Sequence, residues 1–179
     1  MSVIIEESGI SFGEYDDADV FYVEKSALYR NLGGGVRTVE FILKKDEKTL
    51  LWVEAKSSSP NPQNAKSVSD FENFLSELCE KFEHSLSLYT SAILKRIADS
   101  NDEIPNQMRE MDYSRASFKM ILVIRGHKES WLQPISDGFK RKMRACIKIW
   151  NIDPTRDVAV INEEGAKKYK LTIAKARED

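Results

Sequence analysis

The chain has 179 residues, of which 41% are hydrophobic and 31% are charged. This composition is typical of one folded domain and excludes a disordered chain, and no apolar run reaches the roughly 18 residues that a membrane-spanning helix needs. The net charge of −2 provides no overall attraction to nucleic acid. It counts against a nuclease unless basic side chains gather locally.

The cysteines and the N-terminus predict where the protein works. Cys79 and Cys146 fall in apolar helical patterns without metal-ligand spacing, which predicts buried free thiols in a reducing compartment. The first residues lack a basic region followed by a long apolar stretch, so no signal peptide is expected. We therefore expect one cytoplasmic domain over residues 1–179 that does not enter a membrane.

The N-terminal part predicts short strands separated by turns. Residues 3–5 are apolar and predict a strand that is followed by a loop with glycines. The segment 20–32 fits two structures. Aspartates before it and Gly33–Gly35 after it favour a capped helix, whereas Val20–Val23 is typical of a strand. We favour a strand followed by a helical turn, and then a β-hairpin over 36–56.

The remainder predicts alternating helices and strands. Residues 57–62 form a loop by composition, and apolar residues at steps of three and four predict a helix over 69–98 that a Ser69–Glu72 capping box begins. The segment 118–124 is the most apolar strand, so we expect it to be central and covered on both faces. The last elements that the sequence predicts are a helix over 131–150 capped by Ser130 with Pro134 in its first turn, a turn at 151–154 and a strand at 158–161.

The predicted hairpin places two acidic residues face to face. If residues 46–48 form its loop, Glu40 lies opposite Glu54, and Thr38 lies opposite Lys56. Alternation along a strand puts Glu54 and Lys56 on one face. Like charges directly opposite one another destabilise a sheet, so two facing carboxylates beside an ammonium indicate a site for a hard divalent cation such as Mg²⁺.

This spacing resembles the PD-(D/E)XK nuclease superfamily, in which an acid on one core strand precedes an (Asp/Glu)-x-Lys on the next. Glu40 matches the first acid, Glu54 the second and Lys56 the lysine. The first acid is Glu instead of the usual Asp, and no Pro precedes it. The resemblance covers residues 36–58 and extends loosely into the following helix.

The resemblance implies an α/β fold of the restriction-endonuclease-like type, a mixed sheet with an antiparallel hairpin, a parallel strand and flanking helices. It also implies hydrolysis of phosphodiesters with Mg²⁺ or Mn²⁺ held by Glu40, Glu54 and the carbonyl of Ala55. Lys56 would orient the attacking water, and Glu24 matches an additional upstream acid of some members. The implied substrate is nucleic acid, with DNA favoured over RNA, and a homodimer is left open.

The predicted helix 131–150 carries a basic stripe, composed of Lys140, Arg141, Arg144 and Lys148. A basic helix face is suited to tracking a phosphate backbone. A solvated amphipathic helix explains the same pattern. If the stripe contacts phosphates, it supplies the local positive charge that the overall composition lacks.

Other interpretations of the hairpin stay open. Glu40, Glu54 and Lys56 fit the solvent-facing positions of an ordinary strand, but Ile42, Leu50 and Trp52 would share their face, which argues for partial burial. The chain also fits a non-catalytic module of the same fold that binds nucleic acid or protein, or an enzyme of other chemistry that uses the same carboxylates.

Overall fold

The computed structural model describes residues 1–61, 63, 68–98 and 102–172. Its strands are β1 (Ser2–Glu7), β2 (Ile10–Asp16), β3 (Val20–Phe21), β4 (Phe41–Asp46), β5 (Thr49–Lys56), β6 (Ser117–Ile124) and β7 (Val158–Ile161). Its helices are a 3-10 turn η1 (Asp17–Asp19), α1 (Ala27–Arg30), α2 (Val68–Ile93), α3 (Asn106–Arg109), α4 (Glu129–Lys142), α5 (Arg144–Ile149) and α6 (Glu163–Lys168).

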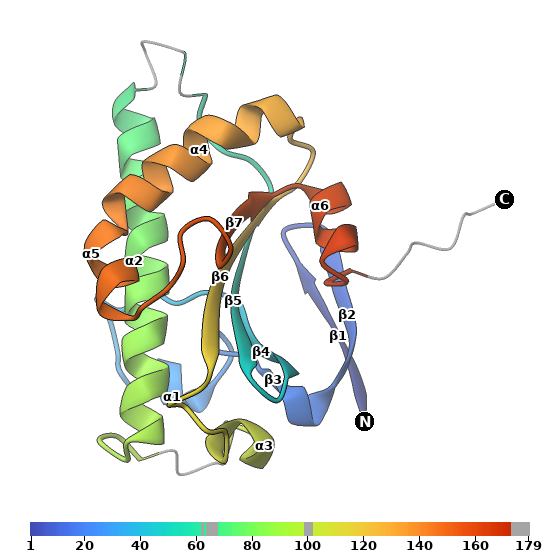
Figure 1. Cartoon of the computed structure of the whole chain (residues 1–179), viewed down its shortest axis with the longest axis vertical. Coiled ribbons are helices and arrows are strands. Elements are labelled where there is room, and N and C mark those ends of the chain that lie inside the picture. Colours follow the sequence, from blue (N-terminus) through green and yellow to red (C-terminus); the bar gives the residue numbers. More distant parts are fainter. Residues whose placement is uncertain (62, 64–67, 99–101, 173–179) are drawn as a thin grey trace, which may run out of the picture.

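The central feature is a mixed sheet with the strand order β3-β4-β5-β6-β7 (Figure 1). The pairs β3–β4 and β4–β5 are antiparallel, whereas β5–β6 and β6–β7 are parallel. The chain leaves β5, runs through α2 and returns as β6, which is the crossover that parallel neighbours require. The predicted α/β class, with its antiparallel hairpin, parallel strand and flanking helices, is confirmed.

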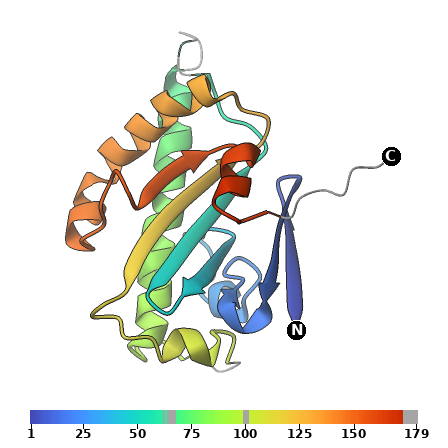
Figure 2. The same ribbon diagram turned by 45° about the vertical axis from the view of Figure 1, so that its right-hand side comes forward.

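Two layers cover this sheet. Helices α2, α4 and α5 lie over one face, and the β1–β2 hairpin and α6 lie over the other (Figures 1 and 2). Strand β6 shows how the sequence builds both contacts, because Met120, Leu122 and Ile124 face the helices and Ile121 and Val123 face the hairpin layer. The prediction that this strand is buried on both faces is confirmed, but the middle strand of the sheet is β5, and β6 lies next to it.

The β4–β5 connection corrects one detail of the predicted hairpin. The turn consists of Glu47 and Lys48, and an irregularity next to it pairs Asp46 with Thr49. Beyond that bulge the register returns to the predicted one, with Phe41 opposite Val53. A bulge adds one residue to one strand, so it compensates for a turn that is one residue shorter than expected.

The sequence predicts only the first strand of the N-terminal hairpin. The strand at residues 3–5 lies within β1, but β2 falls where glycines indicated a loop. Gly13 explains the error, because it lies inside β2 with φ +126° and a Cβ there would lie 2.8 Å from the carbonyl oxygen of Val3. Glycine is required for that close approach of the strands and does not mark a loop. The expected strand and helical turn within 20–32 are confirmed as β3 and α1.

Helix boundaries differ from the sequence expectations in several places. Ser69 lies within α2, so the predicted capping box does not begin that helix. The helix expected at 131–150 is two helices, α4 and α5, that meet at Met143. Because α4 begins at Glu129 after Lys128, Ser130 is not its cap and Pro134 lies in its second turn. Helix α6 was not expected; its N-cap is Asn162, whose side chain accepts from the Gly165 N–H.

Candidate active site

Glu40 and Glu54 are buried beneath helix α2. Glu54 has no exposed surface and Glu40 is 5% exposed. On β5, Glu54 shares its face with Leu50 and Trp52, which pack against the helices. The interpretation of these carboxylates as solvent-facing strand residues is therefore wrong, since both faces of the sheet are covered.

A lysine from α2 joins the two carboxylates. The Lys81 ammonium lies 2.9 Å from Oε1 of Glu54 and 3.9 Å from Oε1 of Glu40, so both carboxyls face the same side of the sheet. The Lys56 ammonium lies 2.6 Å from the same oxygen of Glu54. The predicted pairs Glu40–Glu54 and Thr38–Lys56 are not part of the β4–β5 ladder, because β4 begins at Phe41 and the Glu40 N–H donates to the Val53 carbonyl at 3.1 Å. Lys81 instead connects the two carboxyls, and Lys56 contacts Glu54.

The position of Lys81 in the helical pattern indicates that its side chain is turned toward the core. Lys81 follows Leu78 by three residues and precedes Ser85 by four, and both of these neighbours are buried. Residues at this spacing share one helix face. A lysine on the buried stripe of a long helix needs a charged partner, and the carboxylates of the sheet supply it.

Two further carboxylates approach Glu40 from the other side. Oxygens of Glu7, Glu24 and Glu40 lie within 4.8 Å of one another. The backbone N–H of Glu24 donates to the carbonyl of Glu40 at 3.4 Å, which holds the β3–α1 connection beside β4. Glu7 was not predicted, because the sequence did not reveal the hairpin whose end carries it. We call Glu7, Glu24 and Glu40 the acidic cluster.

The tip of the β1–β2 hairpin is tied to β5. The Ser8 hydroxyl donates to the carbonyl oxygen of Ala55 at 3.1 Å, and Glu7 immediately precedes it. Glu7 also accepts a hydrogen bond from the Tyr22 hydroxyl and pairs with Lys25 at 3.1 Å. These contacts hold Glu7 near Glu40 although the two residues are far apart in sequence.

The crowding of charges shifts the protonation of the site. Burial, together with the nearby carboxyls of Glu24 and Glu54, raises the pKa of Glu40 to about 9. Burial also raises the pKa of Glu54, against the opposing effect of the Lys81 and Lys56 ammonium groups. Burial lowers the pKa of Lys81, but the attraction of Glu54 and Glu40 exceeds that effect and the net pKa is raised.

Lysine ammonium groups contact Glu54 most closely, while Glu7 pairs with Lys25 at 3.1 Å and Glu40 lies 3.9 Å from Lys81. Both oxygens of Glu54 lie near lysine ammonium groups, and the Ala55 carbonyl is already hydrogen-bonded. By contrast, Oε2 of Glu40 is buried and has no hydrogen-bond partner in the described part of the chain. The donor set that best fits a divalent ion is therefore the acidic cluster. It shares Glu40 with the predicted metal ligands and Glu24 with the predicted catalytic residues, and Glu7 is additional.

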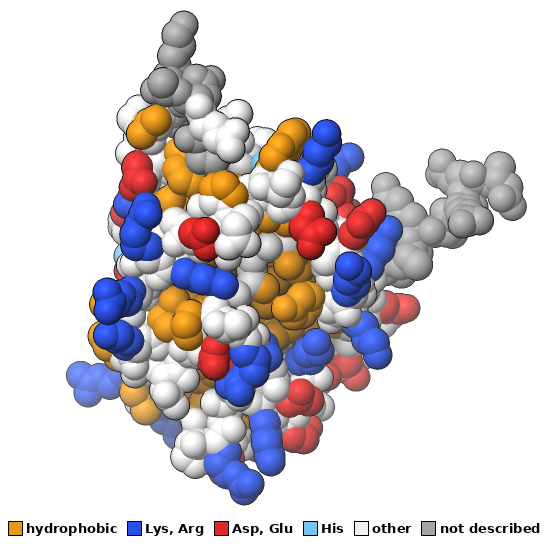
Figure 3. All heavy atoms as spheres, turned by 45° about the horizontal axis from the view of Figure 1, so that its top comes forward, with side chains coloured by type: hydrophobic (Ala, Val, Ile, Leu, Met, Phe, Trp, Pro, Cys, Tyr) orange, Lys and Arg blue, Asp and Glu red, His pale blue; other side chains and the backbone are white. Residues whose placement is uncertain are grey.

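The predicted basic stripe is divided between two helices. Lys140 and Arg141 lie in the last turn of α4, whereas Arg144 and Lys148 lie on α5. Arg141 lies 3.6 Å from Glu72 of α2, so part of its charge is balanced. Figure 3 shows Lys and Arg side chains mixed with acidic and hydrophobic ones on the face that is turned forward.

Comparison of the chain with protein-family models, curated proteins and solved structures found no match. Within the described residues, no helix combines the length and the apolar character needed to cross a membrane. Both cysteines are free and buried, as the sequence predicted.

Proposed function

We propose that this protein is a Mg²⁺- or Mn²⁺-dependent phosphodiesterase that acts on nucleic acid, with DNA favoured over RNA, and that its fold is restriction-endonuclease-like. The support is local and topological. An acid precedes β4, a Glu-x-Lys ends β5, a helix follows, and β6 pairs in parallel with β5. The acid and the Glu-x-Lys side chains share one face of the sheet.

One observation carries the proposal, the unbalanced burial of Glu40. This carboxyl is 5% exposed, one of its oxygens has no hydrogen-bond partner in the described part of the chain, and the carboxyls of Glu7 and Glu24 lie beside it. An ionised Glu40 is costly here, and without a cation the cost is relieved by protonation, since the pKa of Glu40 is raised to about 9. A hard divalent cation at the acidic cluster would offset that cost, because Mg²⁺ prefers carboxylate oxygens.

In this proposal, one group of side chains binds the metal ion and another contacts the phosphate. Glu7, Glu24 and Glu40 would hold the ion, which when bound would lower the pKa of water and polarise a phosphoryl oxygen. Glu54 fixes the Lys56 ammonium at 2.6 Å. Lys56 is only partly buried, so its ammonium can orient water and offset charge on the phosphate. The Lys81 ammonium opposes the effect of burial, which raises the pKa of Glu54.

The test is a cleavage assay on a panel of single- and double-stranded DNA and RNA with Mg²⁺ or Mn²⁺. We expect cleavage that EDTA abolishes and that Lys56→Ala reduces by at least about 100-fold, the scale of a lost charge-stabilising group. Lys48→Ala, at the exposed β4–β5 turn, is the matched control and should cut normally. The proposal fails if the folded wild-type protein cuts nothing, or if Lys56→Ala and Lys48→Ala behave alike.

A second candidate is a non-catalytic module of the same fold. The observation that favours it is the close pairing of Glu54 with both Lys56 and Lys81, which is also what a structural ion network would look like. In that case the protein binds no divalent ion at the acidic cluster and Lys56→Ala changes only stability. Metal binding measured by calorimetry, in parallel with the cleavage assay, separates the two candidates.

A further inference from the structure

A cavity of about 300 Å³ lies just beyond the carboxyl ends of β5 and β6. Lys56 and Ile124 pair at the ends of these strands, and the N–H of Arg125 donates to the Lys56 carbonyl at 2.8 Å. The loops that leave the two strands then meet, because the Ser59 hydroxyl lies 2.7 Å from Nε2 of His127. The carboxyl ends of parallel strands are where open α/β sheets bind ligands.

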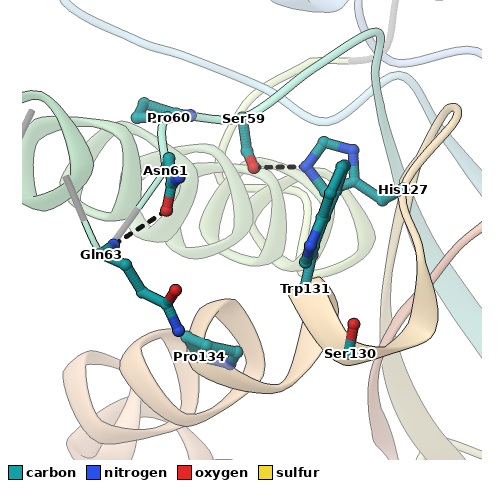
Figure 4. Close-up of a pocket in the computed structure, with 8 residues that line it drawn as sticks. All are labelled: Ser59, Pro60, Asn61, Gln63, His127, Ser130, Trp131 and Pro134. Atoms are coloured by element: carbon teal, nitrogen blue, oxygen red, sulfur yellow. Dashed lines mark hydrogen bonds between the residues drawn. The ribbon is translucent and has the colours of Figure 1, made fainter.

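The cavity has an aromatic wall and polar edges. Trp131, in the first turn of α4, lines it and is 51% exposed. In Figure 4 the Trp131 ring stands between His127 and the segment that carries Asn61 and Gln63, and the Gln63 side chain extends toward Pro134. The remaining lining residues are Ser59, Pro60 and Ser130.

Neighbouring side chains hold the Trp131 ring. The His127 ring is perpendicular to it, at 88° with 5.7 Å between ring centroids. The Lys128 ammonium lies 5.4 Å from the centroid of the Trp131 ring, yet Lys128 does not line the cavity. The Lys128 contact thus comes from outside the cavity, whereas His127 and Trp131 both contribute to its lining.

We propose that this cavity holds an unpaired nucleobase that stacks on Trp131, so that the substrate is single-stranded or has an unpaired end. The inference rests on the proposed function, because it takes nucleic acid as the ligand. An indole face accepts any base by stacking, and amide and hydroxyl groups at the edges of the cavity suit the polar rim of a base. Bases inside an intact duplex are stacked on one another and cannot enter.

The distance between the cavity and Lys56 allows one nucleic-acid strand to contact both. Ser59 follows Lys56 by three residues, and three residues span at most about 11 Å. A nucleic-acid strand advances about 3.4 Å per nucleotide when stacked, so the cavity lies within roughly three nucleotide steps of the lysine. The exposed Ser57 and Ser58 lie between them. A base in the cavity would therefore hold a nearby phosphate close to Lys56.

The test is binding of fluorescent oligonucleotides in EDTA, where no hydrolysis occurs. The probes are single-stranded oligo-dT, oligo-dA and oligo-U and a blunt DNA duplex. Trp131→Ala should weaken single-strand binding by roughly 5- to 150-fold, the range that lost base stacking spans. Trp131→Phe, which keeps a stacking face, should retain most of the affinity. Ile149→Ala, which removes another exposed hydrophobic side chain, is the control.

The outcomes of this experiment test the base site separately from the proposed phosphodiesterase activity. A loss confined to single strands and rescued by Phe supports the base site, and comparison of oligo-dT with oligo-U identifies DNA or RNA. The base site is overturned if Trp131→Ala binds like wild type, if the duplex loses the same affinity, or if wild type binds no probe. If Trp131→Ala shows the expected loss but no substrate is ever cut with Mg²⁺, the base site stands and the phosphodiesterase proposal falls.

Discussion

The ammonium of Lys81, in the middle of helix α2, lies 2.9 Å from Oε1 of Glu54, a carboxyl that has no exposed surface. This pair connects the helix layer to the central sheet at the point where the candidate site lies. Removal of one partner from a buried pair leaves the other charge uncompensated, which costs more than the pair itself contributes. Stability and site geometry are therefore coupled here.

The first prediction concerns that pair. Lys81→Met should lower the free energy of unfolding by about 3 kcal/mol, because Glu54 loses a partner in a buried position. Urea denaturation measures the change. The neighbouring Glu80→Ala, which removes only an exposed pair with Arg37, should cost less than about 1 kcal/mol. Equal effects of the two substitutions would show that Lys81 does not stabilise Glu54.

The second prediction concerns pH. The folded-state pKa of Glu40 is about 9, above the ordinary value of 4.5. Between these values the folded state binds more protons than the unfolded state, so this group contributes stability that is full below pH 4.5 and is lost as pH rises to about 9. Without metal, Glu40→Gln should flatten the decline in stability over this window, as urea denaturation at several pH values would show. Glu6→Gln, on exposed β1 surface, should leave the decline unchanged; if both variants decline like wild type, Glu40 is not the titrating group.

The third prediction tests which carboxylates hold the ion. Glu7→Gln should weaken Mn²⁺ binding by at least about tenfold, the lower end of what changes around metal sites cost. Glu6→Gln removes the same charge from the adjacent residue, which is exposed, and should bind Mn²⁺ like wild type. Calorimetric titration measures both affinities. If Glu7→Gln binds normally while Glu54→Gln does not, the ion belongs to the Glu40, Glu54 and Ala55 set instead.

The fourth prediction concerns the basic stripe on α4 and α5. Lys140→Glu combined with Arg144→Glu should weaken nucleic-acid binding and reduce the slope of log affinity against log salt concentration, because fewer counterions are released. The same binding assay at several salt concentrations measures both quantities. Lys48→Glu, at the β4–β5 turn, serves as a charge-reversal control away from the stripe, although it changes the net charge by half as much as the double variant. If the salt dependence of binding is unchanged in the double variant, the basic stripe faces solvent and does not contact nucleic acid.

Local patterns determined much of the fold. Alternation within 36–56 predicted the β4–β5 hairpin, and the apolar stripe after it predicted α2 apart from its ends. The register that brings Glu40 and Glu54 onto one face was also predicted, although the turn differed, because the hydrophobic faces of a strand constrain its pairing more strongly than the loop does. The local sequence at 20–23 fits both a helix and a strand. The strand forms through pairing with β4, and β3 contains only Val20 and Phe21.

The composition of the site depended on contacts between distant parts of the chain. Sequence alone predicted that Glu40, Glu54 and Lys56 lie near one another, because they are close in sequence and side chains alternate between the two faces of a strand. Only the tertiary structure brought Lys81 from α2 and Glu7 from the N-terminal hairpin to them, and only it decided that both faces of the sheet are covered. Burial is a property of how layers pack, so the raised pKa of Glu40 could not be deduced from the spacing of its neighbours.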